Sequence, residues 1–290
     1  MTMTTKTGFF ASAGLALTLV FSGESGFGSE TSELYVRAAR ERYADPSYTN
    51  TCLPCFNIDT KYRFDLPSSA NETVRWIDVG GARNVRDIGW TGLRRGRVYR
   101  GTELNKVGPH GLELTAKGRK VMLEDLGIKT DLDLRAETRT ARGDCLDKSA
   151  LGPDVRFISK PIRPYLEIFG SPLFAETVRL FADPTIYPIY IHCWGGADRT
   201  GCLSLVLEGL CGVAEPDLAI DYELTSFGCV GPRLRTGTKG APFPEVLAKI
   251  KSFPGATLRD KFENFVLQDL KLTPEDVAAI RRNLECGQKE

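Results

Sequence analysis

The sequence has little histidine and no excess of charge of either sign. Its 290 residues include two histidines, and 38 Lys and Arg residues stand against 37 Asp and Glu residues. This balance gives no basis for nucleic-acid binding, which depends on a basic surface. Cys52 and Cys55 have no second ligand pair nearby, which argues against a structural zinc site. We therefore expect no metal, no cofactor and no nucleic-acid partner.

Internal repeats and low-complexity runs are absent, and the apolar N-terminal stretch at residues 8–21 is too short to span a membrane. With the polar start before it and a small-residue cleavage position after Gly28, this stretch is typical of a bacterial signal peptide at residues 1–28. A buried N-terminal helix is the alternative. Export predicts a periplasmic or extracellular protein with no integral membrane segment in the mature chain, and a local Cys52–Cys55 disulfide.

The remaining chain divides into a turn-rich N-terminal extension at residues 29–70 and a segment at residues 71–290 that is long enough for one large domain. Hydrophobic periodicity and end signals predict strands at residues 155–158 and 187–191 and helices at residues 115–126, 173–181, 200–208, 216–226, 258–270 and 273–284. Residues 236–244 are predicted to be a glycine- and proline-rich loop, and the loop around Pro161 and Pro164 is expected to overhang the functional site.

The segment His192–Gly201 is the most informative part of the sequence, because it places a thiol, Cys193, and a guanidinium, Arg199, around a short glycine-containing loop. The predicted strand 187–191 precedes it and the predicted helix 200–208 follows it. Backbone N–H groups and the macrodipole at a helix start stabilise a thiolate and bind anions. The segment therefore predicts a phosphate-binding catalytic loop.

A second Cys and Arg pair, Cys229 and Arg235, has the same spacing. Glycines and a proline surround it, so no helix can begin where this chemistry needs one. We interpret the second pair as a coincidence.

In the predicted loop Cys193 attacks phosphorus and Arg199 holds two phosphate oxygens in its planar fork. Thr200 is expected to donate its hydroxyl to the sulfur, and His192 to orient the loop through backbone hydrogen bonds. A strand–turn–helix junction with a buried Cys and a surface Arg is the alternative. Because glycines let successive N–H groups turn inward, the phosphate-binding residues are predicted to be Trp194, Gly195, Gly196, Ala197 and Arg199.

His-Cys, five residues, Arg and Thr resembles the signature of the cysteine-dependent phosphatases, and Asp198 directly before Arg199 resembles a bacterial tyrosine-phosphatase family among them. Residues 81–89 resemble the Asn-x-Arg-Asp motif of that family, with its following strand at residues 97–101. Residues 126–135 are similar to its strand that ends in Asp-Leu-Arg.

The resemblance extends over residues 74–284 and implies an α/β fold like that of the protein tyrosine phosphatases, with a central, mostly parallel sheet flanked by helices. It implies supporting roles for Arg86, Asp87 and Arg135. The alternative for Arg86 and Asp87 is a surface turn, and Arg135 either binds ligand or braces the loop from below.

The sequence departs from better-known tyrosine phosphatases because it has no Trp-Pro-Asp segment to supply a general acid. Asp198 is the candidate acid by its family position. The alternative is a structural carboxylate paired with Arg86 or Arg135. Asp183 is a weaker candidate, because it is expected to cap a turn.

The implied activity is hydrolysis of a phosphorylated protein, or of a small phosphomonoester, by a protein-tyrosine phosphatase or a dual-specificity relative. An inositol-phosphate or phosphoinositide phosphatase is the second hypothesis, although Ala197 stands where such members often carry Lys. The arginines at 94, 95, 97 and 100 either restore that positive charge or form a solvated strand face. A non-catalytic phosphate-binding module and a sulfur-transfer enzyme are more distant alternatives.

Overall fold

The computed structural model describes residues 77–105, 112–135, 148–225 and 240–285, with residues 139–140, 143–144, 230–231, 233–235 and 237 between them. The predictions for residues 1–28 and 29–70 and for Cys52, Cys55 and Cys229 lie outside the described residues.

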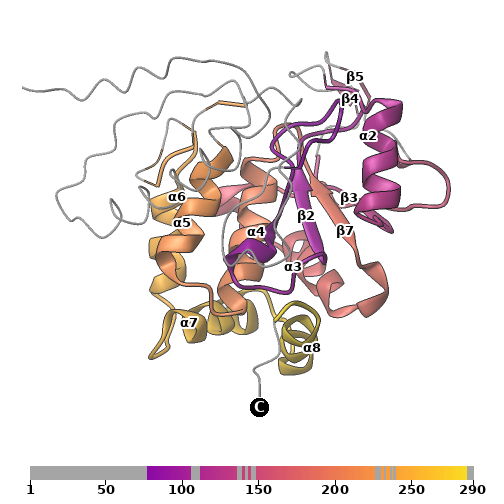
Figure 1. Cartoon of the computed structure of the whole chain (residues 1–290). Coiled ribbons are helices and arrows are strands. Elements are labelled where there is room, and N and C mark those ends of the chain that lie inside the picture. Colours follow the sequence, from indigo (N-terminus) through magenta and orange to yellow (C-terminus); the bar gives the residue numbers. More distant parts are fainter. Residues whose placement is uncertain are drawn as a thin grey trace, which may run out of the picture.

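A five-stranded sheet in the order β1-β2-β7-β3-β6 lies at the centre of the domain (Figure 1). Its strands are β1 (Arg86–Asp87), β2 (Val98–Gly101), β3 (Thr130–Asp133), β6 (Arg156–Ser159) and β7 (Ile189–His192). β1 is antiparallel to β2, and the other neighbours are parallel. Strands β4 (Arg139–Thr140) and β5 (Gly143–Asp144) form a separate antiparallel pair. The predicted mostly parallel sheet is confirmed.

The register of the sheet brings three strand ends to one edge. Gly101 at the end of β2 pairs with His192 at the end of β7, and His192 pairs with Asp133 at the end of β3. The segments that follow these three strands therefore meet at the carboxyl edge, where ligands bind in open α/β sheets.

Helices cover both faces of the sheet (Figure 1). On one side lies α2 (Ala116–Lys120), which continues as the π-helical turn η2 (Val121–Asp125). On the other lie α3 (Pro172–Arg179), α4 (Asp198–Leu210), α5 (Glu215–Leu224), α6 (Phe243–Lys251), α7 (Leu258–Asn264) and α8 (Pro274–Leu284). Short helical turns are η1 (Ile88–Thr91), η3 (Tyr165–Ile168), η4 (Leu180–Ala182), η5 (Pro184–Ile186) and η7 (Phe265–Asp269).

Strand side chains alternate between two apolar cores, as the period of two requires. Tyr99 and Tyr190 pack with Met122 on the α2 side. Ile189 and Ile191 belong to the larger core on the side of the helix layer.

The helix that follows the central strand is the interior helix of that layer. Every residue of α4 from Thr200 to Leu210 is buried, and α4 packs against α3, α5, α7, α8 and β7. A helix that is buried on all sides lies in the core of the domain. The predicted order of strand, loop and helix around residues 193–197 is confirmed, and the helix start is thereby held at the carboxyl edge.

Local end signals account for several boundaries. Thr115 caps α2 by accepting from the Gly118 N–H, and Gly127 ends the helical segment with a φ of +63°. Asp183 caps η5. α6 begins at Phe243, inside the predicted loop 236–244, because a proline at position 244 is compatible with the first helical turn.

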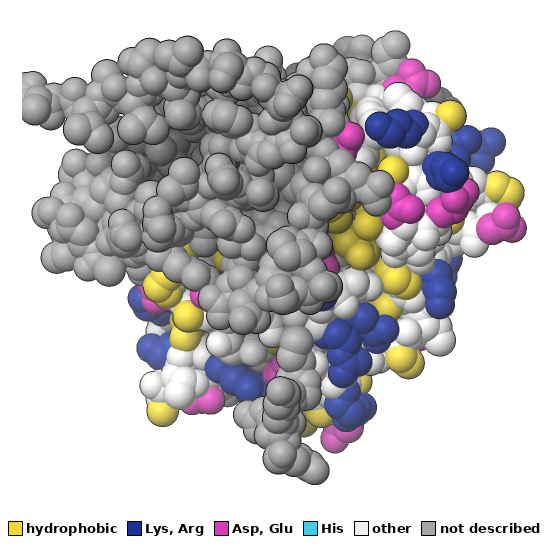
Figure 2. All heavy atoms as spheres, in the orientation of Figure 1, with side chains coloured by type: hydrophobic (Ala, Val, Ile, Leu, Met, Phe, Trp, Pro, Cys, Tyr) yellow, Lys and Arg dark blue, Asp and Glu magenta, His cyan; other side chains and the backbone are white. Residues whose placement is uncertain are grey.

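The described surface carries charges of both signs. Over α2, basic side chains lie among acidic ones (Figure 2). Within the described residues, none of the helices is long and apolar enough to cross a membrane.

We expect Gly209→Ala to destabilise the domain. A Cβ at Gly209 would lie 2.5 Å from the ring of Phe262, which is fully buried between α4 and α7. Overpacking costs about 1–3 kcal/mol, more than the about 0.5–1 kcal/mol that alanine gains over glycine in a helix. The urea midpoint should fall. Gly201→Ala is the control, because its Cβ meets neighbours only at 3.5 Å or more; equal midpoints for both variants would contradict the account.

Candidate active site

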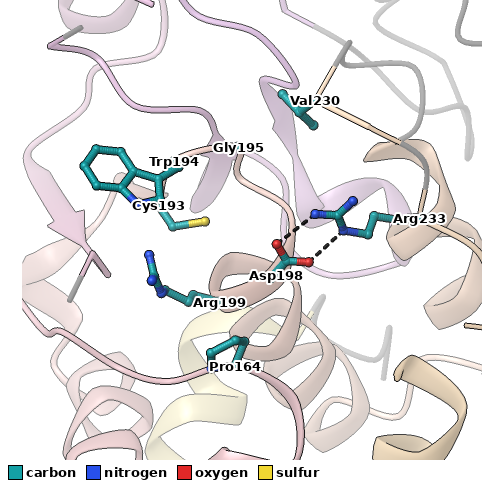
Figure 3. A pocket seen from close by; sticks show the side chains of 8 residues that line it. All are labelled: Pro164, Cys193, Trp194, Gly195, Asp198, Arg199, Val230 and Arg233. Atoms are coloured by element: carbon teal, nitrogen blue, oxygen red, sulfur yellow. Dashed lines mark hydrogen bonds and ion pairs between the residues drawn. The ribbon is translucent and has the colours of Figure 1, made fainter. Parts of the chain in front are cut away.

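Cys193 lies in a cavity of about 210 Å³ at the carboxyl edge of the sheet (Figure 3). Cys193 is 3 % exposed. The residues that line the cavity are Pro164, Cys193, Trp194, Gly195, Asp198, Arg199, Val230 and Arg233. The structure therefore brings the predicted thiol and guanidinium into one cavity, and Pro164 of the loop that was expected to overhang the site lines it. Val230 and Arg233 were not predicted to line the site.

The loop of residues 193–197 leads directly into the first turn of α4. Ala197 occupies the N-cap position and offers no side-chain hydrogen bond to the helix. The N–H groups of a first helical turn have no partner within the helix, and they carry the positive end of its dipole. This arrangement suits an anion bound beside Cys193.

Neighbouring strands hold the carbonyl groups at the start of the loop. The Leu134 N–H donates to the His192 carbonyl at 2.9 Å, and the Glu103 N–H donates to the Trp194 carbonyl at 3.1 Å. These donors follow β3 and β2, the two neighbours of β7.

Buried side chains hold the carbonyl groups in the middle of the loop. Asn84 Nδ2 lies 3.1 Å from the Gly195 oxygen and 3.2 Å from the Gly196 oxygen, and Arg100 Nη2 donates to the Gly196 oxygen at 2.8 Å. A trans peptide points its N–H opposite to its C=O. Because the carbonyls face the protein, the N–H side of the loop faces the cavity.

Gly196 is required by both conformation and space. Its φ is +62°, and a Cβ would lie 2.2 Å from the Gly101 oxygen. A side chain at 196 would push the loop away from the end of β2.

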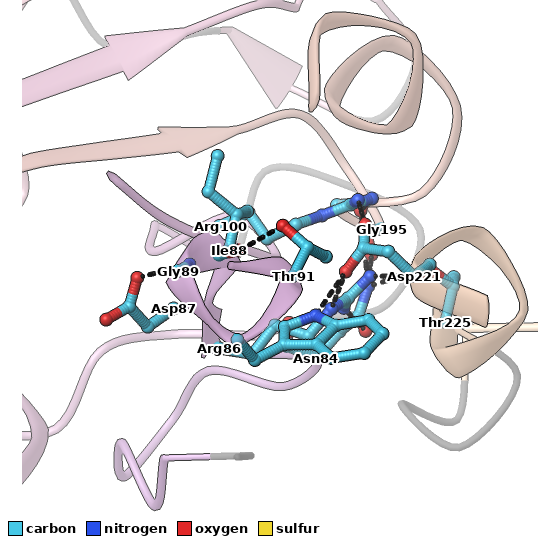
Figure 4. Close-up of polar contacts among 12 residues, drawn as sticks. Asn84, Arg86, Asp87, Ile88, Gly89, Thr91, Arg100, Gly195, Asp221 and Thr225 are labelled. Atoms are coloured by element: carbon cyan, nitrogen blue, oxygen red, sulfur yellow. Dashed lines mark hydrogen bonds and ion pairs between the residues drawn. The ribbon is translucent and has the colours of Figure 1, made fainter. Parts of the chain in front are cut away.

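Asp221 of α5 binds the two arginines beneath the loop, Arg86 and Arg100 (Figure 4). Its carboxylate accepts from Arg86 Nε at 2.8 Å, from Arg100 Nη1 and from Trp90 Nε1 at 3.2 Å. Burial by itself raises the pKa of Asp221, but the two guanidiniums outweigh it and lower the pKa to about 2. Sequence reasoning missed Asp221, since a lone carboxylate in a helix carries no spacing signal.

Arg86 and Asp87 are neighbours in sequence, but only Arg86 contacts the residues that hold the loop. Arg86 is fully buried and donates to Asn84 Oδ1 at 2.5 Å, which orients the amide that holds the loop. Asp87 faces away from the loop (Figure 4) and accepts from the Gly89 and Gly96 N–H groups at 2.8 and 2.7 Å. Arg86 thus supports the loop, whereas Asp87 holds two turns.

Arg135 contacts the loop through the Trp194 ring and is itself held by Asp133. Asp133 accepts from Arg135 Nε at 2.9 Å and from Nη2 at 2.6 Å. The guanidinium carbon lies 4.7 Å from the centre of the Trp194 ring, a cation–π contact. Arg135 therefore fixes Trp194, a wall of the cavity.

His192 is a positioning group. Its Nε2 lies 3.0 Å from Asp131 Oδ1, and Nδ1 donates to the Cys193 carbonyl at 3.3 Å. Burial lowers the pKa of His192, but Asp133 and Asp131 outweigh burial and raise it overall.

The alternative role for Asp198 was a structural carboxylate paired with Arg86 or Arg135. Asp198 pairs with neither of these arginines. It pairs with Arg233, whose Nε and Nη2 lie 2.7 and 2.8 Å from its two oxygens, and it accepts from the Tyr165 hydroxyl. Arg86 and Arg135 were the wrong partners because each is already bound to another carboxylate.

Two other predictions have a mixed outcome. The Thr200 hydroxyl is buried and has no hydrogen-bond partner among the described residues, so the structure does not show its predicted bond to the Cys193 sulfur. The arginine run does not form one surface, because Arg94 and Arg95 are exposed whereas Arg100 is fully buried.

We expect the stability lost in Asp221→Asn to depend on pH. The variant leaves two buried guanidiniums without their carboxylate, which costs about 3–5 kcal/mol. Because the pKa of Asp221 falls from 3.8 to about 2 on folding, its contribution is complete above pH 3.8 and is lost as the pH falls toward 2. Urea unfolding should show a gap between wild type and variant that narrows below pH 3.8. A gap that is constant or widens there would contradict the assignment.

No protein of curated function matches the chain. Among solved structures, the core catalytic domain of the PP-IP phosphatase SIW14 from S. cerevisiae in complex with citrate is similar, with 20 % identity and a TM-score of 0.35 over 46 % of this chain and 73 % of that chain. A structure of the Siw14 catalytic core is 20 % identical, with a TM-score of 0.33 over 47 % and 73 %. The sequence profile of the tyrosine phosphatase family matches residues 77–285, well over half of the chain. The chain therefore belongs to the tyrosine phosphatase family and is a phosphatase.

Proposed function

We propose that this phosphatase hydrolyses phosphotyrosine in proteins through a cysteinyl-phosphate intermediate at Cys193. One observation carries the proposal: the Cys193 side chain lies in the same cavity as Arg199, at the start of α4, with the loop carbonyls bound on the opposite side. This is the environment that a thiolate nucleophile and a phosphate dianion both need.

The proposed reaction has two steps. In the first, the Cys193 thiolate forms a bond to phosphorus, the bond from phosphorus to the phenolic oxygen breaks, and Asp198 gives its proton to that oxygen. In the second, water gives a proton to the Asp198 carboxylate and attacks phosphorus. The S–P bond then breaks and releases inorganic phosphate and the thiolate. Arg199 and the loop N–H groups bind the equatorial oxygens in both steps.

The walls of the cavity support an aromatic ester. Trp194, Val230 and Pro164 provide apolar surface, which suits a phenyl ring better than a polyol. A phenolate also leaves with less protonation than an alkoxide. Hydrolysis of a tyrosine phosphate ester therefore depends less on proton donation by Asp198. Activity toward phosphoserine and phosphothreonine, if present, should be slower.

Arg233 favours a second candidate, an inositol-phosphate or phosphoinositide phosphatase. It supplies a guanidinium to the cavity, although Ala197 supplies no charge. Comparison of kcat/KM for a phosphotyrosine peptide, inositol hexakisphosphate and a phosphoinositide separates the two functions. Higher kcat/KM for either inositol compound would show that the preferred substrate is an inositol phosphate and not phosphotyrosine.

We expect rapid quenching during turnover of a phosphotyrosine peptide to trap phosphate on Cys193, detected by peptide mass spectrometry. Cys193→Ser should lower kcat by about 10³-fold or more, because the hydroxyl does not ionise at neutral pH. Cys211→Ser, at the other end of α4, is the matched control and should leave kcat unchanged. Full activity in Cys193→Ser would falsify the proposed nucleophile.

The role of Asp198 is tested with aryl phosphates that differ in the basicity of the leaving group. In Asp198→Asn the loss of kcat/KM should grow as the leaving group becomes more basic, because the missing proton then matters more. A loss of the same size for every leaving group would show that Asp198 only shapes the cavity.

A further inference from the structure

We infer that Arg233 determines substrate specificity by exchanging its ion pair with Asp198 for one with a second anionic group of the substrate. The substrate class is a phosphomonoester with a carboxylate or a second phosphate beside the scissile group. This inference rests on the proposed function and adds to it a preference among substrates.

The geometry places Arg233 where it can reach both partners. Arg233 and Asp198 line the cavity that contains Cys193, and in Figure 3 Asp198 lies between the Cys193 sulfur and the Arg233 guanidinium. The side chains of the pair remain 18 % and 33 % exposed. A group on the substrate can therefore approach the guanidinium from the cavity.

The pair has the two-pronged geometry that arginine also forms with phosphate and carboxylate ligands. Its two bonds of 2.7 and 2.8 Å are equivalent to those that an anionic substrate group would offer. Burial by itself lowers the pKa of Arg233, but its hydrogen bonds and charge interaction with Asp198 raise it overall. Arg233 is therefore a fixed positive charge that a second anion can share or take over.

The proposed acid keeps a second contact during this exchange. Asp198 accepts from the Tyr165 hydroxyl, which is itself 2.9 Å from the Tyr222 hydroxyl. When a substrate anion engages Arg233, this bond still holds the Asp198 carboxyl group beside the cavity.

Two kinds of molecule present such an anion, and both use the same chemistry. In a peptide, the anion is an acidic residue next to phosphotyrosine. In a small molecule, it is a second phosphate on the same ring. The experiment includes one arm for each.

We expect kcat/KM of the wild-type protein to be about tenfold higher for a phosphotyrosine peptide with flanking aspartates than for the same peptide with flanking asparagines, as one buried charge pair of about 1.4 kcal/mol would give. A benzene bisphosphate should exceed phenyl phosphate in the same way. In Arg233→Met both ratios should fall to about one, whatever the change in the absolute kcat/KM. Arg233→Lys, which keeps the charge without the fork, should give intermediate ratios.

Arg179→Gln is the matched control. Arg179 pairs with Asp276 at 3.0 Å, between α3 and α8 and outside the cavity, and its replacement should leave both ratios as in wild type. Ratios that persist in Arg233→Met would overturn the inference while leaving the proposed hydrolysis intact. Failure of the wild-type protein to hydrolyse any of the four esters would instead contradict the proposed function.

Discussion

The site depends on the hydrogen bonds that hold the carbonyl groups of the 193–197 loop against the protein. Asn84 and Arg100 provide the central ones, and Asp221 fixes Arg100 and, through Arg86, the amide of Asn84. A neutral hydrogen bond such as those of Asn84 contributes about 0.5–1.5 kcal/mol, and a bond to a charged group such as Arg100 about 1.5–3 kcal/mol. A reversed peptide in this loop is therefore disfavoured. The loop thus meets an anion already in its binding conformation, which removes the cost of reorganisation.

Buried charge beneath the loop also favours binding of an anion. Arg86 and Arg100 each carry a positive charge, and Asp221 compensates only one of them. Glu208 of α4 lies close by, and burial raises its pKa well above the usual range. The two guanidiniums under the loop complement both a thiolate and a phosphate dianion. At the edge of the cavity, by contrast, Arg233 and Asp198 neutralise each other, which leaves that part of the site responsive to the charge of the ligand.

The sequence predicted those features that depend on neighbours along the chain. Apolar periodicity predicted α4 and α8, and the capping residue Thr115 marked the start of α2, because helix ends are decided by residues within one turn. The loop itself was predicted from its strand and helix context. Asp221 and Arg233 were missed as site residues, and Arg100 was considered only as part of a basic run. All three lie far from the loop in sequence, and only the packing of α5 and the register of β2 with β7 bring Asp221 and Arg100 beneath it. The partner of Asp198 was missed for the same reason. Arg86 and Arg135 were the arginines considered, and packing pairs Arg86 with Asp221 and Arg135 with Asp133.

The central claim is that the loop between β7 and α4 presents its N–H groups to an anion bonded to Cys193. A crystal structure with vanadate tests it most directly. The account predicts a vanadium atom bonded to the Cys193 sulfur, with its equatorial oxygens contacting the loop N–H groups and the Arg199 guanidinium, while the carbonyls of residues 195 and 196 keep their bonds to Asn84 and Arg100. Vanadate bound elsewhere, or a loop whose carbonyls turn toward it, would contradict the account.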